Sequence, residues 1–279
     1  MTLRYDTISF LSDLGVADES VGVVHSVIRS IAPQAHTIDI THGITPHDIR
    51  AGSLCLARAV QYVAPGVVLA VIDPTVGTPR RAIAVEVGEG AGVLVGPDNG
   101  LLASAVAMTG GATRAVELTN TDYHLGLLGR TFSCRDIFAP VAAHLCNGVA
   151  VTEVGTEIDP LSLMPGLMPL ARNEGGTLIA EVLWVDHFGN AQLNIGADDL
   201  DDLLGNDPTA RVRMDFTAGG RVGFRMAGIK DTFANIASSD AGLVSDSYGL
   251  LSICLNQRSA AEELGIHVGT EITLSMLTS

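Results

Sequence analysis

The stretch TFSCRDIFAP at residues 131–140 places a hydroxyl, a thiol, a guanidinium and a carboxylate in four consecutive positions. An apolar run follows at once. Polar groups directly before such a run are typical of the start of a helix. A nucleophilic Cys134 is one interpretation, because the charge of Arg135 favours a thiolate. The next histidine, His144, is ten residues further along the sequence and about three helical turns away. We therefore favour packing over nucleophilic catalysis as the role of Cys134.

A second candidate site lies at the end of the apolar strand VVLAVID. Asp73 ends this strand, and Arg80 follows seven residues later across a loop that contains a glycine. A carboxylate in such a position needs a partner, and Arg80 is available to pair with it. Ligands of open α/β sheets bind outside the carboxyl ends of the strands, so this pair is a candidate for chemistry.

Other polar residues stand at similar positions, but a structural role is favoured for each when it is taken alone. Asp13 ends the first predicted strand. Asp18 and Asp48 suit helix caps, His42 suits a loop histidine with satisfied hydrogen bonds, and residues 97–100 (PDNG) suit a turn.

Several familiar motifs are absent from the sequence. Neither G-x-x-x-x-G-K-[ST] nor a G-x-G-x-x-G after the first strand occurs, which disfavours a nucleotide held by its phosphates. No H-E-x-x-H or comparable cluster of ligands is present, so we expect no metal site. The missing G-x-S-x-G motif argues against an α/β-hydrolase.

The composition restricts the class of protein. With 279 residues, 47% hydrophobic and 17% charged, the chain can bury a sizeable core. The net charge of −15 disfavours nucleic acid and anionic membranes as partners, because both are bound by clustered Lys and Arg. Four scattered cysteines without a C-x-x-C pair indicate reduced thiols in the cytoplasm. We expect neither a signal peptide nor a membrane-spanning segment.

The elements that must position these residues follow two patterns. Apolar strands such as TISFLS alternate with segments of helical spacing, which predicts an α/β domain with a mostly parallel central sheet at residues 1–160. Prolines and glycines without periodicity predict a linker at 161–176. Short strands separated by turns then predict an all-β, barrel-like domain at 177–279.

Seven motifs occur in the order and spacing of one known family. They are FLSDLGVADESVG (10–22), DITHGITPHDIRAG (39–52), VIDPTVGTPRR (71–81), GPDNGLL (96–102), TFSCRDIFAPVAAHL (131–145), VDHFGN (185–190) and DSYGLLSICLN (246–256). By these motifs the chain resembles the S-adenosylmethionine (SAM) hydroxide adenosyltransferases, also called SAM hydrolases, which are relatives of the fluorinases and chlorinases. The resemblance covers essentially the whole chain.

The resemblance implies a fold, an assembly and a reaction. Family members join an α/β domain to a β-barrel and form homotrimers, with the ligand held between the N-terminal domain of one subunit and the C-terminal domain of the next. Water or hydroxide attacks the 5′ carbon of SAM in line and gives adenosine and L-methionine. SAM is then the substrate, and neither a cofactor nor a metal is needed.

The resemblance also implies roles for residues of both predicted domains. Asp13 would hold the ribose hydroxyls, Ser20 would lie near the methionine end, and His47 stands where halogenases carry an aromatic residue near the ribose. In the second domain, Asp186 would pair with the methionine ammonium, and Ser247 would bind the methionine carboxylate. Asn190 and Phe233 would contact the adenine.

The family's hydrolases surround the attacking water with an Asp–Arg–His triad. Asp73 and Arg80 match the first two members, whereas Ser133 stands at the position of the histidine and Cys134 replaces a small glycine. Thr75 also stands where a glycine is common.

Three hypotheses about the activity are consistent with these residues. Halogenases lack the carboxylate of Asp73, which should repel a halide, so we favour water as the nucleophile, with Asp73, Arg80 and Ser133 as the catalytic residues. The alternatives are a halide-using 5′-halo-adenosine synthase, which carries Arg where this chain has Tyr248, and a catalytically impaired relative that binds SAM or adenosine.

Overall fold

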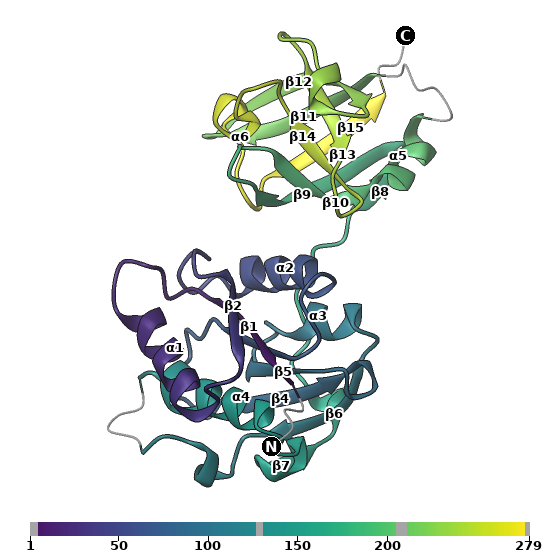
Figure 1. Ribbon diagram of the computed structural model, residues 1–279. Coiled ribbons are helices and arrows are strands. Elements are labelled where there is room, and N and C mark those ends of the chain that lie inside the picture. Colours follow the sequence, from purple (N-terminus) through teal and green to yellow (C-terminus); the bar gives the residue numbers. More distant parts are fainter. Residues whose placement is uncertain (1–4, 127–130, 205–210, 277–279) are drawn as a thin grey trace. The chain divides into compact units, whose positions relative to one another are not determined.

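The computed structural model describes residues 5–126, 131–204 and 211–276 of the chain. The chain divides into two compact units, Met1–Leu167 and Met168–Ser279 (Figure 1). The point of division falls inside the segment predicted as a linker.

The first unit is built on a seven-stranded sheet with the order β2-β1-β3-β5-β4-β6-β7. Its strands are β1 (Thr7–Ser12), β2 (His36–Thr41), β3 (Val67–Val71), β4 (Ala82–Val87), β5 (Gly92–Pro97), β6 (Ala112–Glu117) and β7 (Thr156–Ile158). The pairs β1–β2, β1–β3 and β3–β5 are parallel, whereas β4 pairs antiparallel with both β5 and β6, and β7 antiparallel with β6. All strands except β4 and β7 therefore run in one direction, and the prediction of a mostly parallel sheet is confirmed.

Helices cover both faces of this sheet. The α-helices are α1 (Ser20–Ile31), α2 (Ile49–Val60), α3 (Ala103–Met108) and α4 (Ala139–Cys146), and a π-helical turn, η3 (Cys134–Phe138), leads directly into α4. Shorter 3₁₀ turns are η1 (Gly88–Gly90), η2 (Thr121–Tyr123), η4 (Val151–Glu153) and η5 (Pro160–Ser162). Helices α1 and α4 pack together on one face, and α2 and α3 pack together on the other (Figure 1).

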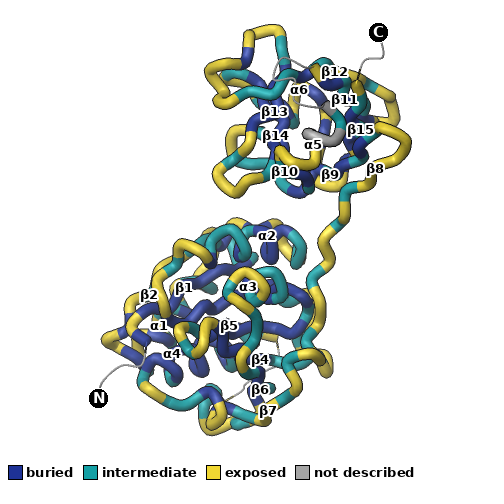
Figure 2. Tube along the Cα trace, turned by 90° about the vertical axis from the view of Figure 1, so that its right-hand side faces the viewer, coloured by how far each residue is buried: buried dark blue, intermediate teal, exposed yellow. Residues whose placement is uncertain are grey.

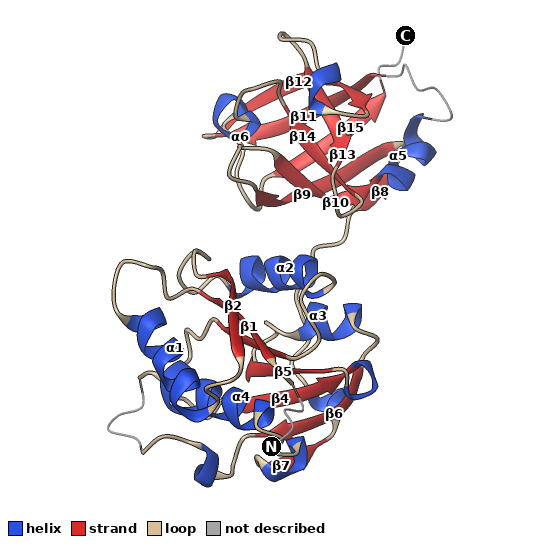
Figure 3. Cartoon of the chain, in the orientation of Figure 1, coloured by secondary structure: helices blue, strands red, loops and turns tan. Residues whose placement is uncertain are grey.

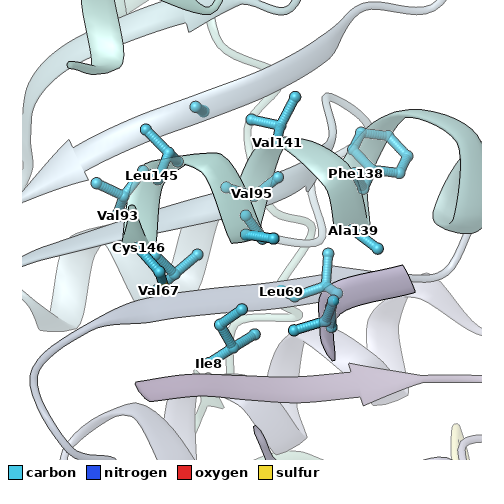
Figure 4. Close-up of a cluster of buried hydrophobic side chains, with 14 of the residues drawn as sticks. Ile8, Val67, Leu69, Val93, Val95, Phe138, Ala139, Val141, Leu145 and Cys146 are labelled. Atoms are coloured by element: carbon cyan, nitrogen blue, oxygen red, sulfur yellow. The ribbon is translucent and has the colours of Figure 1, made fainter. Parts of the chain in front are cut away.

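The core explains why the central strands are rich in apolar residues. Every residue of β1 and β3 is buried, and Figure 2 shows these strands dark blue at the centre of the unit. On one face, strand residues such as Ile8, Leu69 and Val95 meet Phe138, the last residue of η3, and Leu145, near the end of α4 (Figure 4). Each such side chain contributes about 1.5–3 kcal/mol by its burial. The η3–α4 segment is thereby fixed against this face of the sheet.

The second unit is a closed barrel (Figure 3). Its strands are β8 (Arg172–Glu174), β9 (Thr177–Val185), β10 (Ala191–Gly196), β11 (Arg211–Ala218), β12 (Arg221–Lys230), β13 (Ala241–Ser245), β14 (Leu250–Cys254) and β15 (Glu271–Met276). They follow the order β10-β14-β13-β12-β11-β15-β9-β8, and the pairing of β10 with β9 closes the ring, so that β8 lies outside it. Short helices α5 (Ala197–Leu204) and α6 (Ala260–Leu264) and the turn η6 (Phe233–Asn235) complete the unit. The prediction of an all-β, barrel-like domain is confirmed.

The first residues of the predicted linker are attached to the α/β unit. Asp98, at the end of β5, accepts a hydrogen bond from Arg81 Nε at 2.8 Å and another from the backbone nitrogen of Met164 at 2.8 Å. Arg81 Nη1 also donates to Ser162 Oγ at 3.0 Å. Asp98 is therefore more than a turn residue, because it holds the departing chain against the sheet.

Within the described ranges, each helix is too short or too polar to cross a membrane.

Candidate active site

The centre of the candidate site is the ion pair between Asp73 and Arg80, directly after β3. Arg80 Nε donates to Asp73 Oδ1 at 2.9 Å, and Arg80 Nη2 donates to Asp73 Oδ2. The side chains of Asp73 and Arg80 are only 6% and 12% exposed, so both charges are largely removed from water. Such a pair persists because the bidentate geometry compensates for the desolvation of the two ions.

The hydrogen bonds to Asp73 leave room for one more donor. Besides the two bonds from Arg80, Asp73 Oδ1 accepts a bond from the hydroxyl of Thr75 at 3.3 Å. A carboxylate offers about four acceptor positions, so Oδ2 retains one that no donor of the described residues fills. A water molecule bound there would be held by a carboxylate whose orientation Arg80 fixes.

The segment after residue 131 forms a wall next to this ion pair. The guanidinium carbon of Arg80 lies 5.2 Å from the ring centroid of Phe138 in η3. In the same turn, Cys134 is buried, and burial first, followed by the negative charges of Asp13 and Asp73, raises the pKa of its thiol. The thiol therefore lies close to both carboxylates. Ser133 precedes it at the start of the turn, in helical conformation.

Arg135 and Asp136 hold this wall in place. Asp136 is buried and receives two hydrogen bonds from Arg135, of 2.6 and 2.9 Å. The Arg135 guanidinium carbon also lies 5.1 Å from the centre of the Phe132 ring. The Arg135 guanidinium thus compensates the buried charge of Asp136 within the turn itself. This compensation stabilises the π-helical turn next to a polar site.

Asp13 lies at the same edge of the sheet, after β1. Its Oδ2 accepts a hydrogen bond of 2.8 Å from the backbone nitrogen of His47. His47 has a φ of 71°, which is uncommon for a residue other than glycine and is held here by the bond to Asp13. The loop after β2 is thus tied to the loop after β1.

Ser20 is the first residue of α1, and its backbone nitrogen donates to Asp18 Oδ1 at 2.9 Å. The N-cap residue of α1 is Glu19, which makes no side-chain capping bond, so Asp18 binds the first helical residue from one position before the cap. No contact joins Ser20 to Asp73 or Arg80 among the described interactions.

In the barrel unit, Asp186 organises the turn between β9 and β10. Its Oδ1 accepts hydrogen bonds from the backbone nitrogens two and four residues later, at 2.9 and 2.8 Å. Its Oδ2 accepts a bond of 2.8 Å from the side-chain amide of Asn190. Asp246 forms the same kind of turn between β13 and β14, with distances of 2.8 and 3.1 Å, and Ser247 lies exposed within it.

These two turns converge on one buried thiol. Burial, followed by the charges of Asp186 and Asp246, raises the pKa of Cys254 to about 12. Gln192 on β10 donates a hydrogen bond to Asp246 Oδ2 and so links the two hairpins. The predicted ammonium-binding residue and the predicted carboxylate-binding turn therefore belong to one connected region of the barrel.

Asn190 and Phe233 line a common groove on the barrel unit. Its volume is about 710 Å³, and Phe188, Leu255 and Arg258 contribute further parts of the wall. An aromatic ring and an amide on the walls of a mostly apolar groove suit a planar heterocycle with hydrogen-bonding edges. Ser247 is not among the residues that line this groove.

Comparisons with known proteins agree with the motifs. A family model described as the SAM hydroxide adenosyltransferase N-terminal domain matches residues 8–155, and one for the C-terminal domain of the same family matches residues 180–273. The chain belongs to this family.

Individual relatives match along most of their length. The chain is 41% identical over 273 residues to a protein of Salinispora tropica named (R)-S-adenosyl-L-methionine hydrolase, with 96% of this chain and 97% of the relative covered. It is 28% identical to a fluorinase of Actinoplanes sp., with 96% and 97% covered. A solved structure of an uncharacterized conserved protein from Thermotoga maritima superposes with a TM-score of 0.85 at 33% identity, covering 96% of this chain and 99% of that one.

Two features of this family member were not found by sequence reasoning. Thr75, which stands where a glycine is common, donates a hydrogen bond to Asp73. In addition, His25, Asp39 and His42 bring one potential ligand atom each to within 4.8 Å of one another. Asp39 and His42 are three residues apart, but His25 is on α1, and no short motif joins the three. The remaining signal in the sequence is the Asp39-x-x-His42 pair within the DITHG segment.

The raised pKa of Cys134 leads to a prediction about its reactivity. We expect iodoacetamide at pH 8.5 to leave Cys134 unmodified in the folded protein and to modify it rapidly in urea, as measured by peptide mass spectrometry. The unfolded thiol ionises near pH 9 and the folded thiol does not, so this group lowers the stability of the fold as the pH rises above about 9. Equal rates in the folded and unfolded protein would contradict the buried, protonated thiol.

Proposed function

We propose that the chain is a SAM hydrolase. A water molecule or hydroxide attacks the ribose 5′ carbon, a bond forms between this carbon and the oxygen, and the carbon–sulfur bond breaks. The electron pair of the broken bond goes to sulfur, which leaves as the neutral thioether of L-methionine. The water proton is lost to Asp73 or to solvent, and adenosine is the second product.

The observation that carries the proposal is the buried Asp73–Arg80 pair with one remaining acceptor position on the carboxylate. A carboxylate at this point suits water, which can donate to it, and opposes a halide, which has no proton to donate and carries a like charge. The higher identity to the relative named hydrolase (41%) than to the one named fluorinase (28%) supports the same choice.

In the proposed mechanism most of the rate comes from positioning. The sulfonium is already a good leaving group, so the protein has to hold water and carbon in line. Asp73 orients the water and accepts its proton, while Arg80 holds the carboxylate in place through two parallel hydrogen bonds. Positive charge on sulfur disappears as the bond breaks, and a dry wall such as Cys134 and Phe138 favours that change.

We propose binding roles for both units on the basis of their chemistry. Asp13 would hold the ribose hydroxyls, with His47 beside it and Ser20 nearer the methionine end. Asp186 and Ser247 would take the ammonium and carboxylate of methionine.

The groove supports a separate role for the adenine base. Phe233 and Asn190 would stack on adenine and hydrogen-bond to it, because both line the same groove. We also propose a homotrimer in which the α/β unit of one subunit and the barrel of the next share a ligand.

The proposed reaction uses neither a metal nor a cofactor. We also propose a cytoplasmic location, which is supported by the cysteines, because all four are free thiols.

Incubation of the protein with SAM in ¹⁸O-labelled water tests the proposed reaction. We expect adenosine with one ¹⁸O at the 5′ oxygen and unlabelled methionine, because water attacks carbon and not sulfur; liquid chromatography with mass spectrometry measures both. Parallel incubations contain fluoride or chloride. A 5′-halo-adenosine as the main product would overturn the hydrolase proposal, and tight SAM binding without turnover would identify an impaired relative.

The variant Asp73→Asn separates catalysis from folding. We expect kcat to fall by about 100-fold or more, because the amide neither accepts the proton nor pairs with Arg80, while the Kd for SAM changes by less than about threefold. Asp98→Asn is the matched control, since it breaks another largely buried Asp–Arg pair in the same unit. Both variants should lose stability, by up to about 3–5 kcal/mol, but only Asp73→Asn should lose turnover. Unchanged turnover in Asp73→Asn would exclude this mechanism.

The variant Ser133→His tests whether Ser133 merely marks the loss of the triad histidine. We expect kcat for adenosine release to rise by about 10-fold or more, because a histidine adds a second group that orients the water. Ser133→His combined with Cys134→Gly provides space for the ring, and Ser133→Ala is the control. No gain in either histidine variant, together with a loss in Ser133→Ala, would show that the hydroxyl has a role of its own.

A further inference from the structure

A group of three side chains at the edge of the α/β unit has the composition of a metal site. His25 Nε2 lies 2.9 Å from Asp39 Oδ1, and His42 Nε2 lies 3.0 Å from the same oxygen. The three residues come from α1, from β2 and from the loop that follows β2. Two imidazoles and one carboxylate thus converge on a single point.

The environment of His42 favours a cation at this point. Its side chain is only 4% exposed, and its Nε2 is buried without a hydrogen bond of acceptable geometry among the described residues, although Asp39 Oδ1 is close. Its Nδ1 lies 2.8 Å from Ser12 Oγ. When Nδ1 donates to this hydroxyl, the lone pair of Nε2 points toward the carboxylate oxygen, and two acceptors face each other. A cation between them removes that conflict.

We propose that His25, Asp39 and His42 bind one divalent transition-metal ion of the zinc class. Zinc binds nitrogen and oxygen ligands at about 2.0–2.2 Å, and tetrahedral ligands around it are about 3.3 Å apart. The observed separations of 2.9 and 3.0 Å need to widen by only a few tenths of an ångström, and two of the three side chains are free to move. Those two, His25 and Asp39, are 36% and 41% exposed, so water completes the coordination.

The surroundings match those of other bound metals. Ser12 serves as the outer partner that fixes the His42 ring, and Phe10 places its ring 4.5 Å from the His42 ring in an edge-on contact. The carbonyl oxygen of His42 also accepts a hydrogen bond of 2.8 Å from the backbone nitrogen of Gly15. The metal would therefore join α1 and β2 to the loop that carries Asp13.

This site does not depend on the proposed hydrolysis. Neither Asp73 nor Arg80 belongs to the cluster, and the carbon–sulfur bond needs no metal to break. Imidazole ligands favour Zn²⁺, Co²⁺ and Ni²⁺ over Mg²⁺, so Mg²⁺ in excess should not compete.

Titration of the full-length, tag-free protein with ZnCl₂ after treatment with EDTA tests the proposal. We expect one Zn²⁺ per chain with a Kd of about 1 μM or tighter by isothermal titration calorimetry, and visible d–d absorption bands when Co²⁺ replaces Zn²⁺. His25→Asn and Asp39→Asn should each weaken Zn²⁺ binding by more than about 100-fold, and Ser12→Ala by about 10-fold. Exposed His36 lies on the same strand as Asp39, and His36→Asn, the matched control, should bind as the unaltered protein does.

The variants at positions 25 and 39 alter half-exposed side chains, so they should fold, and circular dichroism without metal checks this. Equal Zn²⁺ affinity in the unaltered protein and His25→Asn would overturn the proposal, because the ion would then bind elsewhere. Failure to bind Zn²⁺ at a concentration 100-fold above the expected Kd of about 1 μM would also overturn the proposal. The three side chains would then form a His–Asp–His group that shares a proton. Neither result bears on adenosine formation, which is measured separately.

Discussion

The Asp73–Arg80 ion pair is the interaction on which the rest of the α/β unit's site depends. A carboxylate that is 6% exposed is stable only if its charge is compensated, and Arg80 compensates it while resting on the ring of Phe138. That contact couples the loop after β3 to the π-helical turn, which in turn is held by the apolar face of α4. Moving any one of these elements would expose the pair to water or leave one charge unpaired. The position of the acceptor oxygen is therefore set by the core.

The general fold could be predicted from the sequence because it follows from local pattern. Strand β3, which is buried on both faces, is apolar at every position, and the buried β1 places Ile8, Phe10 and Leu11 among small polar residues. The turn-rich second half marks short strands. A barrel-like domain was predicted, but the strand pairing that closes it was not, since the β10–β9 pairing and the place of β8 depend on contacts among strands that look alike in sequence. Nor does sequence show that Asp98 anchors the first part of the linker, because its partner Met164 is 66 residues away.

The site was predictable to the extent that its residues lie close together in the sequence. Asp73 and Arg80 are seven residues apart, and a strand-end carboxylate followed by an arginine already suggests the pair. The effect of the charges of Asp13 and Asp73 on the Cys134 thiol is different, because three separate strand and helix ends must come near one another to create it. The twin turns at Asp186 and Asp246 carried a visible signal, Asp-x-aromatic-Gly in both cases, which sequence reasoning used only as a family motif.

The replacement of the family histidine by Ser133 becomes understandable once the chemistry and the geometry are considered together. A base matters most when the leaving group is poor, because attack must then proceed far before the bond breaks. A sulfonium leaves readily, and a carboxylate fixed by Arg80 and Thr75 already offers one acceptor position to water. On the proposed reaction, the group at position 133 then contributes orientation more than proton transfer. A hydroxyl at the start of the π-helical turn, one residue before the buried Cys134, can supply orientation without placing another charge beside two carboxylates.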